Sequence, residues 1–265
     1  MFRYCAAAAV FATALSAQVP EFVTGDECLF CHRTGMATTW QQNVHARTVW
    51  PNEKREMFVG AKQARPVKLS GYGKYDILER DGKTWNHEKF AKQCAGCHTT
   101  AVNPKTLEFA TPALDCYTCH GVVDMAHTDD ISKVRFSKKY PKNPLEITSV
   151  CASCHLRGGH SKSNGLPYPT NFIPGADLFK DYEIDLKQAD NPALNPGDRH
   201  IYKSVRDVLQ NGSEVTCVTC HVIHTSGSTK HRRVLTSAIC ADCHNETGPK
   251  SVVKKYQVHS VVCEY

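Results

Sequence analysis

The pattern C-x-x-C-H occurs six times in this chain of 265 residues and uses twelve of its fourteen cysteines. This spacing is the attachment motif of haem c, in which two thiols add to the haem vinyl groups and the adjacent histidine ligates the iron. A single copy would also fit a redox-active pair or half of a zinc site, but six copies that each end in histidine favour haem. We therefore predict six covalently attached haems, numbered 1 to 6 in chain order. The predicted attachment cysteines are Cys28 and Cys31, Cys94 and Cys97, Cys116 and Cys119, Cys151 and Cys154, Cys217 and Cys220, and Cys240 and Cys243. The predicted proximal ligands are His32, His98, His120, His155, His221 and His244.

Residues 1–17 have the features of a secretory signal peptide. Arg3 supplies a positive charge, the run from Ala6 to Leu15 is apolar, and small residues follow it. We expect cleavage after about Ala17, the alternative being an uncleaved N-terminal anchor. No later stretch is apolar enough to predict a membrane span. Haem attachment of this kind takes place outside the cytoplasm, so the mature chain is predicted to be periplasmic or extracellular.

Two cysteines lie outside the motifs. Cys5 is expected to leave with the signal peptide. Cys263, near the C-terminus, is expected to have no chemical role, the alternative being an intermolecular disulfide. Because each motif pair already has a chemical use, no disulfide framework is predicted.

The charge balance does not predict binding of nucleic acid. The formal net charge is +6, and loss of Arg3 with the leader makes it +5. Six haems carry twelve propionates, which if all ionised would bring the mature protein to about −7. Lysines and arginines are therefore expected to pair with propionates or to lie on the surface. No basic run is interleaved with aromatic residues as a strand-binding groove requires.

The number of residues available for each haem determines the fold class that we expect. Residues 18–265 leave about 41 residues for each haem, too few for a large core made of protein alone. We predict one hexahaem domain, mainly α with much irregular coil and minimal β, in which stacked haems form the core. Haems 1 to 3 are placed within residues 23–130, haem 4 within 145–197, and haems 5 and 6 within 198–265. Folding without haem is expected to fail.

Three segments have the pattern of a helix. Thr38–Trp50 is followed by Pro51, Asn86–His98 begins with a capping residue, and Asp198–Gly212 has apolar residues at helical spacing with glycine just past its end. Residues 65–81 contain β-like pieces that could form one hairpin. Residues 251–262 are ambiguous between helix and strand.

Eight histidines outside the motifs could serve as distal ligands, two more than six irons require: His45, His87, His127, His160, His200, His224, His231 and His259. We predict His45, His87, His127, His200, His224 and His259 as the distal set. His160 and His231 rank last because they lie in flexible or basic loops. With histidine in surplus, methionine is not needed as a ligand. Iron with two histidine ligands has a low potential and no vacancy, which suits electron transfer.

The sequence around the first three motifs resembles that of a known family. TGDECLFCHRTGMATTWQQNVHA and CAGCHTTAVNP followed by LDCYTCHGVVDMAH are similar to the opening and central pair of the cytochrome c-554 and c-prime family. The resemblance covers about residues 23–157. It implies that His45 ligates haem 3 and His127 ligates haem 1, and it also implies one five-coordinate iron, on haem 2. The chain departs from that family in having six motifs rather than four and Asp115 where glutamate is usual.

Two functions follow from these observations. The first is electron transport along closely spaced haems, exchanging electrons with redox partner proteins. A special case is a subunit of an extracellular conductive filament, a nanowire in which the tail bearing His259 reaches a neighbouring copy instead of folding back. The alternative is a multihaem oxidoreductase acting on hydroxylamine, nitrite or nitric oxide at an open iron. The sequence offers no catalytic residue motif, so an enzyme is the less favoured interpretation.

Overall fold

The structure is a computed structural model and describes residues 26–41, 43, 45–47, 87–103, 105–106 and 108–224. Several predictions concern residues outside these ranges and stay predictions. They are the signal peptide, the β-like pieces of 65–81, the sixth motif from Cys240 to His244, the ambiguous segment 251–262, His231, His259 and Cys263.

The described part of the chain is rich in helix and has little strand, as predicted. Its α-helices are α1 (Asp26–Cys31), α2 (Thr38–Gln41), α3 (His87–Gln93), α4 (Ala95–His98), α5 (Cys116–His120), α6 (Pro144–His155), α7 (Pro196–Asn211) and α8 (Cys217–Cys220). A π-helix η1 (Arg33–Ala37) and 3₁₀ helices η2 (His45–Arg47), η3 (Met125–Thr128), η4 (Ile131–Lys133), η5 (Leu178–Lys180) and η6 (Leu186–Asp190) accompany them. The longest described helix, α7, has 16 residues, and none of the described helices has the length and apolarity needed to cross a bilayer.

Four short strands form two antiparallel hairpins. Strand β1 (Thr99–Val102) pairs with β2 (Phe109–Pro112), and Thr99 lies opposite Pro112. Strand β3 (His160–Ser161) pairs with β4 (Tyr182–Glu183). The first hairpin joins the second motif to the third, because β1 follows α4 directly and α5 begins shortly after β2.

The two long helices, α6 and α7, both begin with an asparagine cap followed by proline. Asn143 caps α6 by accepting hydrogen bonds from the backbone N–H groups of Leu145 and Glu146, and Pro144 opens the helix. Asn195 caps α7 in the same way, with Pro196 at the first position. Helix α7 ends at Gly212, whose left-handed backbone (φ 65°, ψ 29°) closes the helix. The helix predicted over Asp198–Gly212 is confirmed, and it starts two residues earlier.

The other two predicted helices are interrupted. In the segment predicted as a helix over Thr38–Trp50, the described residues form α2 as far as Gln41 and the 3₁₀ helix η2 from His45. Asn43 lies outside both, and its side chain accepts from the backbone N–H of His45. The segment from Asn86 forms two helices, α3 and α4, which meet at Cys94. After these breaks, His45 lies on η2 and Cys97 lies on α4, each on a helix separate from the one before it.

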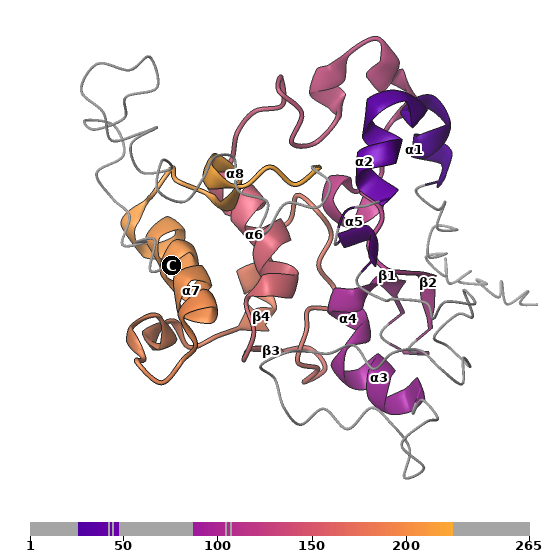
Figure 1. Cartoon of the computed structure of the whole chain (residues 1–265). Coiled ribbons are helices and arrows are strands. Elements are labelled where there is room, and N and C mark those ends of the chain that lie inside the picture. Colours follow the sequence, from indigo (N-terminus) through magenta and orange to yellow (C-terminus); the bar gives the residue numbers. More distant parts are fainter. Residues whose placement is uncertain are drawn as a thin grey trace, which may run out of the picture.

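Helix α6 lies at the centre of the fold (Figure 1). It has α7 on one side and α4 and α5 on the other, and it also contacts α8. A small apolar core fills the contact between α6, α7 and the loops that join them. Its buried members are Ala152, Leu156, Leu178, Tyr182, Ala189, Tyr202 and Val205. This arrangement fixes the end of α6, which carries the fourth C-x-x-C-H motif.

Candidate haem-binding sites

Each of the five described motifs lies on a short helix or at the end of one. Helix α1 ends in the first motif, α4 and α5 carry the second and third, α6 ends in the fourth, and α8 carries the fifth. Cysteines three residues apart on a helix share one face, so both thiols of a motif can reach the same porphyrin. The ten cysteines of these motifs are free thiols, as thioether formation requires: Cys28, Cys31, Cys94, Cys97, Cys116, Cys119, Cys151, Cys154, Cys217 and Cys220.

Burial favours the uncharged form of three motif thiols and of two imidazoles. It raises the pKa of the Cys94 thiol to about 11 and is the largest cause of the rise to about 12 for Cys116 and Cys119. Burial also lowers the pKa of His120 and of His224, which favours neutral rings. Neutral imidazole is the form that binds a metal. The donor set therefore has the chemistry that haem c needs.

Backbone carbonyls fix the tautomer of two histidines. The Nδ1 atom of His120 lies 2.7 Å from the carbonyl oxygen of Arg135, and that of His127 lies 2.7 Å from the carbonyl oxygen of Asp124. A carbonyl only accepts, so both Nδ1 atoms carry the proton. The proton-free Nε2 of each ring can then serve as the metal-binding nitrogen. A metal-ligating histidine usually donates its other ring N–H in a hydrogen bond of this kind.

His45 is held by a side chain instead of a carbonyl. Its Nδ1 lies 3.1 Å from Oδ1 of Asn43, whose own Nδ2 donates to the carbonyl of Ile223 at 2.5 Å. Because the amide nitrogen is used toward Ile223, Oδ1 must accept and Nδ1 of His45 must donate. His45 therefore has the same tautomer as His120 and His127. The ring of Trp40 lies 6.5 Å from that of His45, measured between centroids.

Three pairs of histidine rings lie at similar distances, and each pair joins a motif histidine to one outside the motifs. The centroids of His32 and His127 are 6.2 Å apart, with 20° between the ring planes. The rings of His120 and His224 are 5.9 Å apart at 15°, and those of His45 and His155 are 6.0 Å apart at 74°. An iron held between two imidazole nitrogens, each about 2 Å away, would place the ring centroids about 6 Å apart.

The motifs also contact one another through their cysteines. Thiols of different motifs form hydrogen bonds in three pairs, which are Cys28 with Cys116, Cys97 with Cys154, and Cys151 with Cys217. The second and third motifs meet at a hydrogen bond of 3.0 Å between the hydroxyls of Thr100 and Thr118. Five motifs that are far apart in sequence therefore form one connected group. The fourth motif contacts the second and the fifth, so it joins the fifth motif to the other three.

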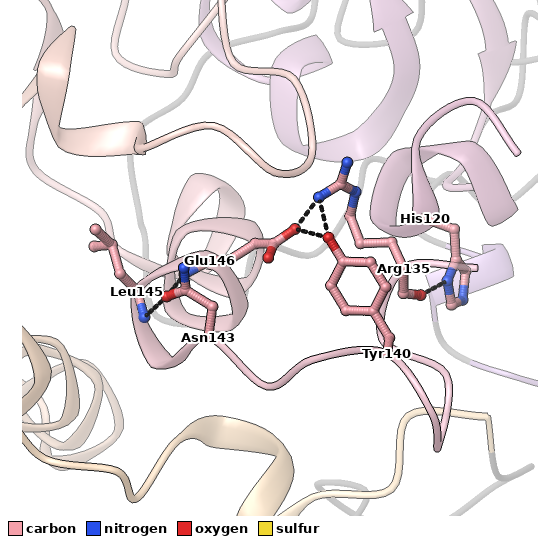
Figure 2. Close-up of polar contacts among 6 residues, drawn as sticks. All are labelled: His120, Arg135, Tyr140, Asn143, Leu145 and Glu146. Carbon is pink, nitrogen blue, oxygen red and sulfur yellow. Dashed lines mark hydrogen bonds and ion pairs between the residues drawn. The ribbon is translucent and has the colours of Figure 1, made fainter. Parts of the chain in front are cut away.

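An ion pair anchors the carbonyl that His120 contacts (Figure 2). The guanidinium of Arg135 binds the carboxylate of Glu146 on α6 and donates to the hydroxyl of Tyr140. The side chain of Glu146 is 9% exposed and that of Arg135 is 30% exposed. Gly175 makes room for the guanidinium, since a Cβ there would lie 2.2 Å from Nη1 of Arg135. The pair thus ties the segment that orients His120 to the helix that carries the fourth motif.

Replacing Glu146 by glutamine is expected to lower the free energy of unfolding by about 1–3 kcal/mol. The substitution leaves a half-buried guanidinium without its counter-charge, and the cost stays below that of a fully buried pair because Arg135 is partly solvated. Denaturant unfolding of the holoprotein measures it. The matched control is Glu88→Gln, which breaks the exposed pair with Lys92 on α3 and should give no measurable change. Equal unfolding midpoints for the two variants would contradict the anchoring role of Glu146.

The remaining predicted ligands are placed as follows. His98 ends α4, His221 follows α8, His87 begins α3, and His200 lies half-buried on α7. His160 lies on β3 beside Glu183, with 4.0 Å between Nε2 and Oε2, and its side chain is 55% exposed. The described ring pairs bring together His45, His127 and His224 with motif histidines. The predicted ligand roles of His87 and His200 stay predictions.

Sequence reasoning missed three residues that form hydrogen bonds with candidate ligands. Arg135 and Asp124 contribute main-chain carbonyls, which every residue has, so no signal in the sequence could have identified them. Asn43 did carry a signal, because asparagine two residues before a candidate ligand can accept from the following backbone and break a helix. Glu146 lies one turn before the fourth motif and shows no pattern of its own.

Comparison with known proteins found a family match and a similar solved structure. The sequence model of the cytochrome c3 family matches residues 86–168, which include the second, third and fourth C-x-x-C-H motifs. The fold is similar to the crystal structure of the outer cell wall cytochrome OcwA, with a TM-score of 0.49 and 19% identity over 84% of this chain and 67% of that chain. Among curated proteins no match is found. The family match supports the interpretation of the chain as a multihaem c-type cytochrome with covalently bound haem c. It tests neither the count of six haems nor the resemblance to cytochrome c-554 and c-prime.

Proposed function

We propose that this protein is an exported hexahaem cytochrome that carries electrons along closely spaced haems with two histidine ligands each. The observation that carries the proposal is the set of three histidine ring pairs at 5.9–6.2 Å. Each pair has one motif histidine and one other histidine, as proximal and distal ligands of one iron do. Iron with both axial positions filled has no vacancy for a substrate, and this favours electron transfer over catalysis.

The ring pairs support distal ligands for three haems, namely His127 for haem 1, His224 for haem 3 and His45 for haem 4. For haem 1 the assignment agrees with the family resemblance. For His45 it differs, because the resemblance implies haem 3 while the ring of His45 lies beside His155 of the fourth motif. Asn43 contributes to this placement, since its side chain holds the backbone N–H and the ring of His45.

The contacts between motifs support a continuous path for electrons. Haem c supplies one-electron redox chemistry at iron when it is attached. Cysteines of different motifs lie next to one another, so the haems attached to them would be close together, and the Arg135–Glu146 pair ties two of the segments that carry them. The fourth motif would connect the N-terminal motifs to the fifth. The leader-like sequence of residues 1–17 supports a path outside the cytoplasm. Assembly into a filament is the more specific form of the proposal, and electron microscopy of the holoprotein tests it.

Protein produced with a complete haem maturation system should carry six haems per chain. The intact mass is expected to exceed that of the processed polypeptide by six haem masses, each roughly 616 Da. Full reduction should then take six electrons per chain, with no appreciable turnover of hydroxylamine, nitrite or nitric oxide. Five or fewer haems would contradict the count, and rapid turnover of any of these compounds would contradict the electron-carrier role.

A further inference from the structure

We propose that Asn43 is a positioning residue that orients the distal ligands of two neighbouring haems, His45 and His224. The inference rests on the proposed function, which assigns these histidines to haems 4 and 3. Asn43 itself has no exposed surface. Its side chain lies between two segments that are 180 residues apart in the sequence.

One end of the Asn43 amide fixes His45. Oδ1 accepts from the backbone N–H of His45 at 2.9 Å and from Nδ1 of the same ring at 3.1 Å. The first contact sets where the helix turns, and the second sets how the ring is rotated about its bond to the chain. Together they direct Nε2 of His45, and the Nδ1–H bond increases the basicity of the ring as a ligand.

The other end of the amide holds the segment that carries His224. Nδ2 donates to the carbonyl of Ile223, the residue directly before His224. Trp40 makes a parallel connection, because its ring lies 6.5 Å from that of His45 and 6.4 Å from that of His224. Both bridging residues precede His45 by a few positions. One short segment therefore sets the geometry of two ligands that bind different irons.

The angles between ring planes distinguish the site of His45 and His155 from the sites of the other two ring pairs, which are both near-parallel. Two parallel imidazoles donate into the same iron d orbital and split the orbital pair, which produces a rhombic signal in electron paramagnetic resonance (EPR). Perpendicular imidazoles donate into both orbitals and leave them nearly degenerate, which produces a signal with a large maximum g value. The pair of His45 and His155, at 74°, should give the second kind of signal. The pair of His120 and His224, at 15°, should give the first.

The test compares EPR spectra of the oxidised holoprotein and its variants. In Asn43→Ala both contacts are lost, so the signal with the large maximum g value should shift and one rhombic component should change. In Asn43→Asp the acceptor toward His45 remains while the donor toward Ile223 is lost. This variant should therefore retain the large-g signal and change only the rhombic component. Ser161→Ala, which removes a fully buried hydroxyl that donates to Asp181, is the structural control and should leave the spectrum unchanged.

The outcomes separate the positioning role from the ligand assignment. His45→Ala should abolish the large-g signal and give one high-spin haem. If His45→Ala does so while both Asn43 variants match the wild type, the positioning role is refuted and the assignment of His45 stands. If His45→Ala leaves the spectrum unchanged, the assignment itself is wrong. Loss of the large-g signal in Asn43→Asp, or an equal change of all components in Asn43→Ala and Ser161→Ala, would also overturn the role of Asn43.

Discussion

Replacing His127 by alanine is expected to convert one haem from low-spin to high-spin and to leave the other five low-spin. The ring of His127 lies 6.2 Å from that of His32, and its Nδ1 donates to the carbonyl of Asp124, so its Nε2 is the proposed distal ligand of haem 1. Loss of a basic axial ligand should also raise the potential of that haem by on the order of 0.1 V, within the range of about 0.8 V that axial ligands span.

Visible absorption and EPR spectra of the oxidised variant measure this effect. Added imidazole should restore the low-spin state, because it can fill the vacated position without the side chain. His160→Ala is the matched control, since His160 is an exposed histidine on β3 that belongs to none of the three ring pairs. A spectrum of His127→Ala identical to that of the wild type would remove His127 from the ligand set, and with it the assignment of haem 1.

The second large effect concerns folding. Replacing both cysteines of the fourth motif, Cys151 and Cys154, by alanine is expected to prevent the chain from reaching a protease-resistant state. These cysteines contact cysteines of the second and fifth motifs, and α6 packs against α4, α7 and α8. The protein-only core in the described region is small and lies around the same helix. A chain with so little apolar core depends on its covalent cofactors for stability.

The same double substitution in the first motif serves as the comparison. Cys31 is exposed, and the described thiol contact of this motif is a single one, from Cys28 to Cys116. We therefore expect the first-motif variant to lose one haem mass and still fold, as judged by limited proteolysis and by the spectra of its remaining haems. Equal protease resistance of the two variants would show that the fourth motif is not central to the fold.

The sequence predicts what is local and repeated. The C-x-x-C-H spacing predicts the attachment sites, and apolar spacing with a terminal glycine predicts α7 within two residues. The hairpin of β1 and β2 was not predicted, although Thr99, Thr100 and Val102 are residue types that favour strands. Four-residue strands leave too short a pattern to separate from coil.

The partner of each histidine could not be read from the sequence, because it depends on how distant segments pack. His45 and His155 are 110 residues apart, and what brings their rings together is the helix break at Asn43 and the position of α6. Main-chain acceptors such as the Arg135 carbonyl cannot be identified from the sequence, because every residue has a carbonyl. The family resemblance did identify His127 and His45 as ligand candidates, but it implied a different haem for His45.

We propose that the haem irons are held between two histidines, and a near-infrared magnetic circular dichroism spectrum of the oxidised wild-type protein tests this most directly. Charge-transfer bands in this region differ between bis-histidine, histidine–methionine and high-spin haem. The account predicts the bis-histidine band with an intensity that corresponds to the full haem content. A histidine–methionine band, or a high-spin band from any of haems 1, 3 and 4, would contradict it.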